Sequence, residues 1–317
     1  MRFCSLVAAL LLSACAVSNA TSQSVSEAED ELRGTTTKVV ESRPLPIVEV
    51  SGLGQRRIDG AMTYLAIGDS SPTIVTFSIG EDGDVSDVQP HDLTRLFGRK
   101  APQWEAVAGD AAGRVFVLAE STSTIAVLDP RLEDVTHTIR LEIPSSFPLA
   151  SAWAADENSR GEGLVLLANG HVLVAKEKNP PAIVELGPRG AAPEGFRPEL
   201  ALGDRPFSLP ASGESELVAL KHWVLKAKDA KPIGDISELA VDGDGRLYLL
   251  SDQGRAIARL ERELEPAEDK IDVKALFSLP SKVAKPEGLV FASGTPFIAT
   301  DGKKVAADAL YELEPLF

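Results

Sequence analysis

A motif that recurs five times along the chain constrains the fold more than any other feature. Each copy opens with small and acidic residues, runs through an apolar segment to a turn, returns as a second apolar segment and closes on a carboxylate. The opening positions lie 53, 57, 76 and 49 residues apart, and they are Gly52, Glu105, Glu162, Glu238 and Glu287. A period near 50 residues indicates a repeat architecture in which each copy is one supersecondary unit.

Turn signals separate the two apolar halves of each copy, as at Asn169-Gly170. Small residues that tolerate positive φ between apolar runs are typical of β-hairpins. A third apolar segment follows each closing acid, at 74–79, 124–128, 182–186, 256–260 and 309–313. A fourth precedes the next copy, as at 135–143 and 271–278. Four short antiparallel strands per copy predict an all-β fold, a single β-propeller of five blades.

The 76-residue interval fits this pattern least well. Residues 187–212 are rich in Gly, Pro and Ala, which predicts a long loop over one face, with a strand at 215–226 resuming the blade. A sixth blade within this segment is the alternative. Closure of the ring requires the two ends of the domain to meet in one blade, and we expect 47–50 to pair with 309–313, because a closed ring leaves no long free sheet edge.

The first 20 residues predict a secretory leader, with Arg2 followed by an apolar run too short for an ordinary membrane helix. Within it, Leu12-Ser13-Ala14-Cys15 resembles a bacterial lipobox, and this resemblance implies cleavage before Cys15 and lipid on its thiol. A plain signal peptide cut after Ala20 is the alternative. The only other cysteine is Cys4, so the mature domain has no disulfide.

Residues 16–44 are rich in Ser, Thr and Glu without apolar periodicity, and they predict a flexible tether. The propeller domain is expected at 45–317. An exported, lipid-anchored protein of the outer membrane or periplasm is therefore predicted. Its net charge of −15 disfavours nucleic acid and anionic lipid surfaces and favours cations or basic partners, although acidity also serves solubility.

The repeat predicts that acidic side chains gather at one end of the propeller, because the first strand of each blade lines the central channel and the second strand runs back to the same face. Nine carboxylates are placed there, namely Glu105, Glu162, Glu238 and Glu287 near the axis and Asp69, Glu120, Glu177, Asp252 and Asp301 further out. Like charges that converge require a cation, interleaved bases or raised pKa values. Oxygen ligands in a wide funnel suit Ca²⁺ better than Mg²⁺.

Two readings of these acids without a metal remain open. The inner glutamates can accept hydrogen bonds from backbone amides of neighbouring blades and so act as inter-blade latches. Lys176 and Lys178 flank Glu177 and can neutralise part of the ring without any ion.

The segments at 161–186, 235–260 and 285–302 resemble the SdiA-regulated family of exported bacterial propellers, most closely at Val174-Ala175-Lys176-Glu177-Lys178. They are also similar to phytase-type esterase-like propellers and, more distantly, to calcium-dependent lactonases. The lactonase resemblance implies a metal role for Glu162, which stands in a Gly-Glu-Gly context. Gly52 departs from the pattern, since the other copies carry Glu there, so the ring of acids is incomplete.

Catalytic motifs are scarce. No Gly-x-Ser-x-Gly occurs, and His91, His137 and His171 fall away from the predicted acidic face, which leaves His222 beside Trp223 as the remaining candidate base. The sequence therefore predicts a binding module for a small cationic ligand, a divalent cation or an envelope protein, touching the membrane only through its lipid anchor. The alternative is a calcium-dependent hydrolase of ester, lactone or phosphoester bonds, with a channel glutamate as base. The oligomeric state stays open, since a closed propeller can be a monomer.

Overall fold

The computed structural model describes residues 35–100, 103–156, 158–211, 213–261 and 263–317. The predicted leader, its Cys15 and most of the predicted tether lie outside these residues. Strands dominate, and helices make up 7% of the structure. Within the described part of the chain, no helix has the length and apolar character needed to cross a bilayer.

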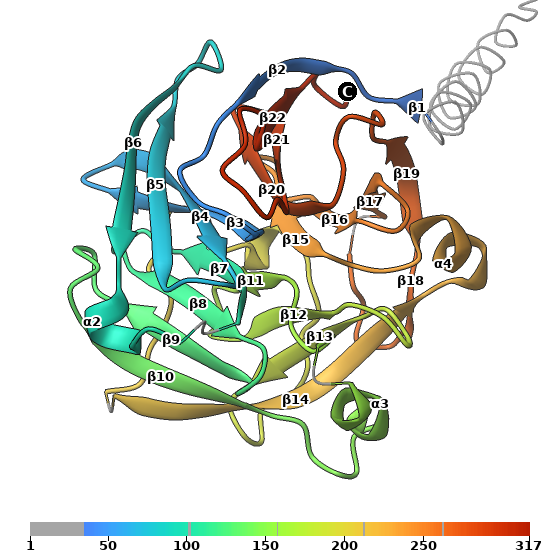
Figure 1. Cartoon of the computed structure of the whole chain (residues 1–317). Helices are drawn as coiled ribbons and strands as arrows, with labels where there is room; N and C mark the ends of the chain where they lie inside the picture. The colour runs from blue at the N-terminus through green and yellow to red at the C-terminus, as the bar shows by residue number, and fades with distance from the viewer. Residues whose placement is uncertain (1–34, 101–102, 157, 212, 262) are drawn as a thin grey trace, which may run out of the picture.

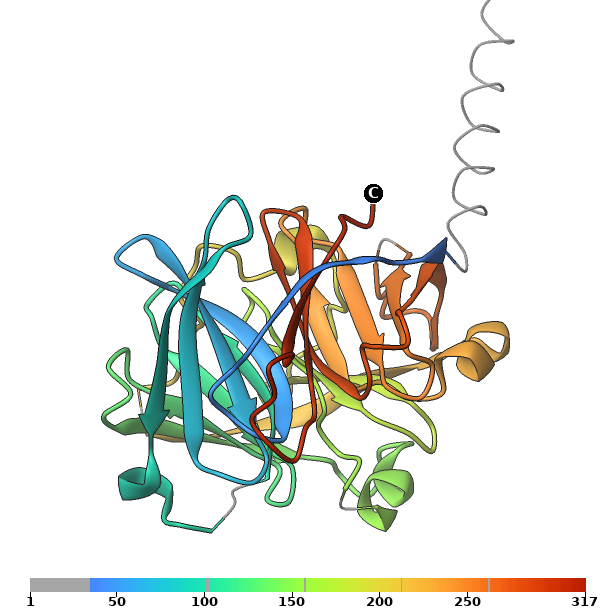
Figure 2. The same ribbon diagram turned by 45° about the horizontal axis from the view of Figure 1, so that its top comes forward.

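The innermost strands form a closed ring around one axis (Figure 1). They are β3 (Val50–Ile58), β7 (Trp104–Gly109), β11 (Leu164–Leu166), β15 (Glu238–Val241) and β20 (Pro286–Ala292). Each of them contacts the next in this order, and β20 contacts β3. Figure 2 shows the same arrangement tilted, with the sheets standing side by side around the axis. This radial arrangement is that of a β-propeller.

Each inner strand is followed outward by antiparallel strands. The second strands are β4 (Ala61–Gly68), β8 (Val115–Ala119), β12 (Val172–Lys176), β16 (Leu247–Ser251) and β21 (Thr295–Thr300). The third strands are β5 (Thr73–Ile79), β9 (Thr124–Leu128), β13 (Ala182–Gly187), β17 (Ala256–Leu260) and β22 (Leu310–Leu313). The outer strands are β6 (Val85–Asp92), β10 (Val135–Glu142), β14 (Glu214–Leu225), β19 (Val273–Ser278) and β2 (Val39–Arg43).

Short elements complete the fold. They are β1 (Thr35–Thr36), which pairs with β19, β18 (Lys270–Ile271), which pairs with β14, the helices α2 (Thr94–Phe97), α3 (Ala150–Ala155) and α4 (Ala227–Ile233), and a 3₁₀ turn at Pro198–Leu200. Residues 188–211 hold no strand, only this turn and single bridges from Phe196 to Leu264 and from Leu167 to Ala201. The predicted long loop is therefore present.

Apolar side chains from facing sheets fill the spaces between them. Trp104 is buried among residues of β4 and β8, such as Leu65 and Val117, and Trp223 is fully buried between the sheets that contain β13 and β16. Burial of one such large side chain stabilises the fold by roughly 1.5–3 kcal/mol. Most residues of the inner strands are buried because both sides of these strands face neighbouring sheets, and polar residues such as Arg56 of β3 are buried there too.

The closing strand differs from the prediction. Val39–Arg43, within the segment predicted to be a tether, pairs antiparallel with β22 through Arg43 and Leu310. Residues 47–49 form no strand; Leu45 and Ile47 instead pack as buried side chains against β3 and β4. The ordered domain thus begins before Leu45, because the polar segment 39–43 covers an outer edge that would otherwise stay exposed.

Two neighbouring sheets are joined at their outer edges by parallel pairing of β10 with β14, which the sequence did not predict. β14 pairs with β13 along its second half, and along its first half it pairs parallel with β10, from Thr138 opposite Glu214 to Glu142 opposite Val218. Arg189 bridges Glu142 and Glu216 across this junction, each at 2.5 Å. The long β14 therefore ties two sheets into one continuous surface (Figure 1).

Candidate functional site

The predicted acidic side chains do gather at one end of the ring. Most lie where the inner strands begin and the second strands end, as the strand pairing of Gly288 with Ala299 and of Glu238 with Leu250 requires. We define the acidic mouth as the carboxylates of Asp69, Glu105, Glu120, Glu162, Glu177, Asp252, Glu287 and Asp301. Glu120 and Glu162 are buried, and the other six are partly buried.

Burial and mutual repulsion raise the pKa values of the inner acids. Burial, followed by the charges of Glu120 and Asp69, raises the pKa of Glu105 to about 9. Burial, followed by the charge of Asp252, raises the pKa of Glu287 to about 9. Glu162 has its pKa raised well above the ordinary value by burial and by Glu105. These carboxyls therefore bind protons near neutral pH unless a cation replaces them.

Glu120 and Glu162 form a carboxyl pair within the mouth. Glu120 is hydrogen-bonded to the Glu162 side chain, which requires a proton on one of the two, and it accepts the backbone N–H of Arg160 at 2.6 Å. Burial raises the pKa of Glu120 to about 7, against these two hydrogen bonds. The pair is thus poised to lose its proton when a positive charge approaches.

The outer acids of the mouth are only partly neutralised. Lys178 bonds Glu177 at 2.6 Å, and Lys285 bonds Asp301 at 2.5 Å. Asp69 and Asp301 each keep one buried carboxylate oxygen, Oδ1, that has no hydrogen-bond partner among the described residues. Burial, with the charges of Glu49 and Asp301, raises the pKa of Asp69. Two lysines against eight carboxylates leave the mouth strongly acidic.

Lys176 bonds no acid of the mouth in the described part of the chain, although its charge interacts with Glu177 and Glu120. Its side chain is fully buried, and its Nζ donates to Ser159 Oγ at 3.3 Å and to the carbonyl oxygen of Lys178. Burial lowers the pKa of Lys176. Through these two bonds Lys176 ties Ser159, which precedes Glu162, to Lys178, which follows Glu177. Lys176 thereby helps to position both glutamates.

Glu238 has a separate role. Its side chain is 1% exposed, and its two oxygens accept the N–H groups of Leu239 at 2.9 Å and of Leu53 at 3.2 Å. Leu53 lies on β3, which is not the neighbour of β15 in the ring, so the carboxyl reaches across the channel. Burial raises the pKa of Glu238 well above its ordinary value. Glu238 therefore acts as a latch between blades, which was one of the roles left open for the inner glutamates in the sequence analysis.

The missing acid at Gly52 follows from the position of Glu238. A Cβ atom at Gly52 would lie 3.5 Å from Glu238 Oε2 and 3.3 Å from the carbonyl oxygen of Glu105. A side chain at position 52 would therefore crowd the backbone of Glu105 and come into contact with the Glu238 carboxyl.

Asp235 is a buried acid that the sequence analysis missed. Its carboxylate accepts Ser251 Oγ at 2.5 Å and the backbone N–H of Gln253 at 3.1 Å, and burial raises its pKa. Its charge contributes to the raised pKa values of Asp252 and Glu287. The sequence could have indicated this acid, because Asp235 lies three residues before Glu238, where a copy of the repeat begins.

In the described part of the chain, none of the four histidines bonds an acid of the mouth. His222 packs edge-on against Phe147 at 5.4 Å, and His91 contacts Thr76 Oγ1 at 2.9 Å. His171 is buried with its Nδ1 2.7 Å from Glu185 Oε1, and His137 lies near Thr136. The residue that a histidine-dependent hydrolase would use as base is therefore not placed beside the acids.

The oxygen atoms of the mouth are the ligands that a calcium ion would need, and their arrangement shows how well the ion would fit. The unpartnered oxygens of Asp69 and Asp301 favour a positive charge in the mouth. However, among the described residues no three His, Cys, Asp or Glu side chains are arranged to hold one metal ion. The side chains shown thus surround an acidic space without forming a ready-made calcium site.

The sequence of the chain matches one known protein family. The family model described as SdiA-regulated matches residues 63–298, which span the chain from β4 to β21. The chain belongs to the SdiA-regulated family. The resemblance drawn from its repeated segments is thereby confirmed. No curated protein sequence matches this SdiA-regulated chain.

Solved structures with similar folds are propellers. Glutaminyl cyclase of Myxococcus xanthus superposes with a TM-score of 0.51 at 13% identity, covering 88% of this chain and 96% of that one. Regucalcin of Agrobacterium tumefaciens, a calcium-binding protein, gives a TM-score of 0.47 at 11% identity over 89% and 95% of the two chains. Virginiamycin B lyase of Staphylococcus aureus gives 0.38 at 12% identity over 87% and 73%. Identities this low show the fold alone.

Proposed function

We propose that this SdiA-regulated protein is an exported, lipid-anchored binding module whose acidic mouth holds a cationic ligand. The observation that carries the proposal is the excess of buried carboxylates at one end of the ring over the two lysines that bond them. A positive ligand would replace the protons held by Glu105 and Glu287 and would satisfy the free oxygens of Asp69 and Asp301. Desolvated charges of one sign attract the opposite charge strongly.

The ligand chemistry that suits this mouth best is an organic cation with several amines. Its charges can be spread over carboxylates that do not converge on a single point. A divalent ion such as Ca²⁺ is the smaller alternative, and it would have to keep part of its water shell or draw the side chains together. An exposed basic segment of an envelope protein would present the same amines.

We further propose that the fold has five blades. Each inner strand of the ring heads a set of four strands, and the segment 188–211, where a sixth blade was the alternative, supplies no strand. The parallel pairing of β10 with β14 joins two of these blades at their outer edges.

Thermal melting with and without cations tests the proposed ligand. In low-salt buffer at pH 8, spermidine at about 100 times its dissociation constant is expected to stabilise the protein by roughly 2.7 kcal/mol. Glu162→Gln removes one buried carboxylate and is expected to halve the shift or more. The matched control is Glu81→Gln, an exposed acid outside the mouth, which should keep the full shift.

Calcium chloride and sodium chloride of equal ionic strength are the other arms of this experiment. A larger shift with Ca²⁺ than with spermidine would identify a metal site instead of an amine site. No shift with either cation, or an equal loss in Glu81→Gln and Glu162→Gln, would exclude the mouth as a cation site.

The proposed location rests on the leader and on Cys15. The unaltered chain, expressed in a Gram-negative host, is expected in the membrane fraction, and Cys15→Ser is expected to shift at least tenfold more of it into the soluble fraction. Mass spectrometry of the mature amino terminus checks the cleavage site. A mature chain beginning at residue 21 would show a plain signal peptide instead of a lipid anchor.

A further inference from the structure

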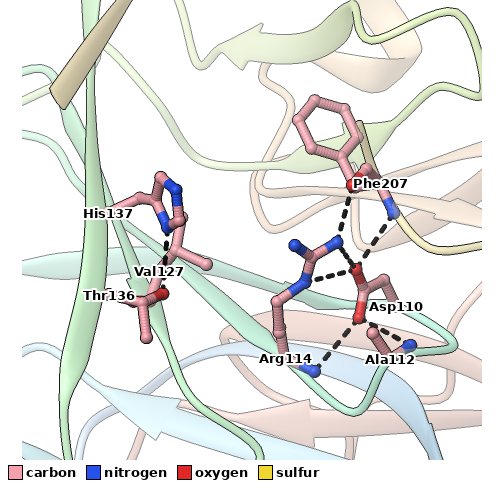
Figure 3. A network of polar contacts seen from close by, with 7 residues as sticks. All are labelled: Asp110, Ala112, Arg114, Val127, Thr136, His137 and Phe207. Atoms are coloured by element: carbon pink, nitrogen blue, oxygen red, sulfur yellow. Dashed lines mark hydrogen bonds and ion pairs between the residues drawn. The ribbon is translucent and has the colours of Figure 1, made fainter. Parts of the chain in front are cut away.

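Acids at the end of the ring opposite the acidic mouth have basic partners. This end contains a cavity of about 1360 Å³, which acidic and arginine side chains line together. Asp110 lies in its wall with a fully buried side chain (Figure 3). Asp110 accepts Arg114 Nε at 2.9 Å and the N–H groups of Ala112 and Phe207, each at 3.0 Å. Two further acid–arginine pairs at the cavity are Asp204 with Arg57 and Asp244 with Arg246. These acids are therefore neutralised without a further cation.

Two carboxylates of the acidic mouth are less completely paired. Asp69 and Asp301 each keep a buried Oδ1 that lacks a hydrogen-bond partner in the described part of the chain. Lys285 bonds Asp301 only through Oδ2, at 2.5 Å. The two acids are near each other, since burial and then the charges of Glu49 and Asp301 raise the pKa of Asp69. A positively charged donor that reaches these two oxygens is therefore stabilised there.

A loop that carries two lysines begins at this point of the mouth. It joins β21 to β22 and spans residues 301–309, whereas the loops between second and third strands elsewhere in the ring have four or five residues. Those loops are 69–72, 120–123, 177–181 and 252–255. We define the lysine loop as residues 302–307. Its root lies beside Asp69, because Gly302 accepts the N–H of Glu49 at 2.8 Å and Glu49 accepts the N–H of Asp69 at 3.2 Å.

The middle of the lysine loop has few contacts that would hold it away from the mouth. Lys303 and Lys304 are exposed, and neither forms an ion pair with another described residue. Val305 is 58% exposed, so little apolar packing stabilises the open position. The ends of the loop are fixed, since the N–H of Thr300 bonds the carbonyl oxygen of Ala309 at 3.1 Å. Exposed segments with few contacts move at a low cost in free energy, so the middle of the loop can move while its ends stay in place.

Lys303 and Lys304 can reach the unpaired oxygens from this position. Lys303 is two residues from Asp301, and two residues of chain span at most about 7 Å. The flexible four-carbon stem of lysine extends this reach and ends in three donors. A lysine ammonium between the two unpaired oxygens would neutralise them as Arg114 neutralises Asp110 at the other end of the ring.

We propose that the lysine loop is a lid that closes on the empty acidic mouth and competes with the ligand. In the closed state, the ammonium of Lys303 or Lys304 bonds the unpaired Oδ1 atoms, and a ligand cation must displace it. Binding then exchanges one positive charge for another, which favours ligands that carry more than one charge. The inference rests on the proposed function, because the lid can compete only if the mouth binds a cation.

Isothermal titration calorimetry with spermidine at pH 7 and low ionic strength tests this competition. Lys303→Gln/Lys304→Gln is expected to bind spermidine about fivefold more tightly than the unaltered protein, as follows from removing a closed state that is populated about 80% of the time. The matched control is Arg140→Gln/Arg189→Gln, which removes two exposed positive charges where β10 and β14 meet. This control should keep the affinity of the unaltered protein.

Cleavage by endoproteinase Lys-C after Lys303 or Lys304 reports the position of the loop directly. A ligand that merely stabilises the fold slows such cleavage, whereas spermidine is expected to accelerate it about fivefold at saturation, because it displaces the lysines from the mouth. Sodium chloride of equal ionic strength should accelerate cleavage less than spermidine does.

The outcomes separate the lid from the proposed cation site. Spermidine that binds Lys303→Gln/Lys304→Gln and the unaltered protein equally, or that slows Lys-C cleavage, would overturn the lid and leave the proposed function standing. Equal tightening in both double variants would also overturn the lid, because net charge alone would then set the affinity. Spermidine that binds none of the three proteins would overturn the proposed function and the competition with it.

Discussion

A Glu287→Gln variant is expected to be more stable than the unaltered protein at pH 8, by about 2 kcal/mol, when measured by chemical denaturation in a chelator without added cation. Burial and neighbouring acids raise the pKa of Glu287 from 4.5 in the unfolded chain to about 9 in the fold. Between these values the folded protein binds a proton that the unfolded chain has released. Stability therefore falls as pH rises from about 4.5 to about 9, and glutamine, which has no charge to bury, removes this loss.

The pH dependence separates this explanation from a general effect of the substitution. The stability gain of Glu287→Gln should be near zero at pH 5, where the unaltered carboxyl is protonated in the fold, and should grow toward pH 9. Glu133→Gln is the control, since Glu133 is exposed and distant from the mouth. A gain that is the same at pH 5 and pH 9 would show that repulsion among the acids is absent.

Local patterns in the sequence were sufficient to place many strands. The segments 124–128 and 256–260 are strands with the predicted bounds, because alternating apolar residues between turn signals specify a short covered strand without help from distant residues. The spacing of the closing acids also placed the carboxylates at one end of the ring. That result follows from the repeat alone, since equal spacing puts equivalent residues at the same height in every sheet.

Contacts between segments far apart in the chain leave no comparable pattern in the sequence, so they were not predicted. Val39–Arg43 has no buried residue and carries three polar ones, so nothing marks it as the closing strand, whereas the apolar Leu45 and Ile47 are buried without pairing. The pairing of β10 with β14 joins two outer edges that are 76 residues apart at Thr138 and Glu214, and edge pairing depends on their meeting in space. The cavity at the opposite end of the ring was missed for the same reason, because residues 198–205 in its wall lie next to Phe207, whose N–H bonds Asp110, 97 residues earlier in the chain.

The division of the glutamates into one latch and a mouth of acids could not be read from the repeat. Glu162, Glu238 and Glu287 stand at equivalent positions, yet of these three only Glu238 accepts two backbone N–H groups from the described residues. The difference arises opposite Gly52, where the absence of a side chain leaves room for one carboxyl to cross the channel. One glycine in one copy thus decides the role of a glutamate in another.

Glu238→Ala is accordingly expected to destabilise the protein by about 3 kcal/mol, the opposite sign to Glu287→Gln. The change leaves the N–H of Leu53 unsatisfied in the buried channel, at a cost of about 1–3 kcal/mol, and creates a cavity at the axis. Glu238→Gln should lose less than about 1 kcal/mol, because an amide oxygen can still accept an N–H and the buried carboxyl already holds its proton, with its pKa raised by burial. Guanidinium denaturation at pH 7 measures both. A Glu238→Gln loss as large as that of Glu238→Ala would mean that the charge is required, and that Glu238 belongs with the cation-binding acids instead of closing the ring.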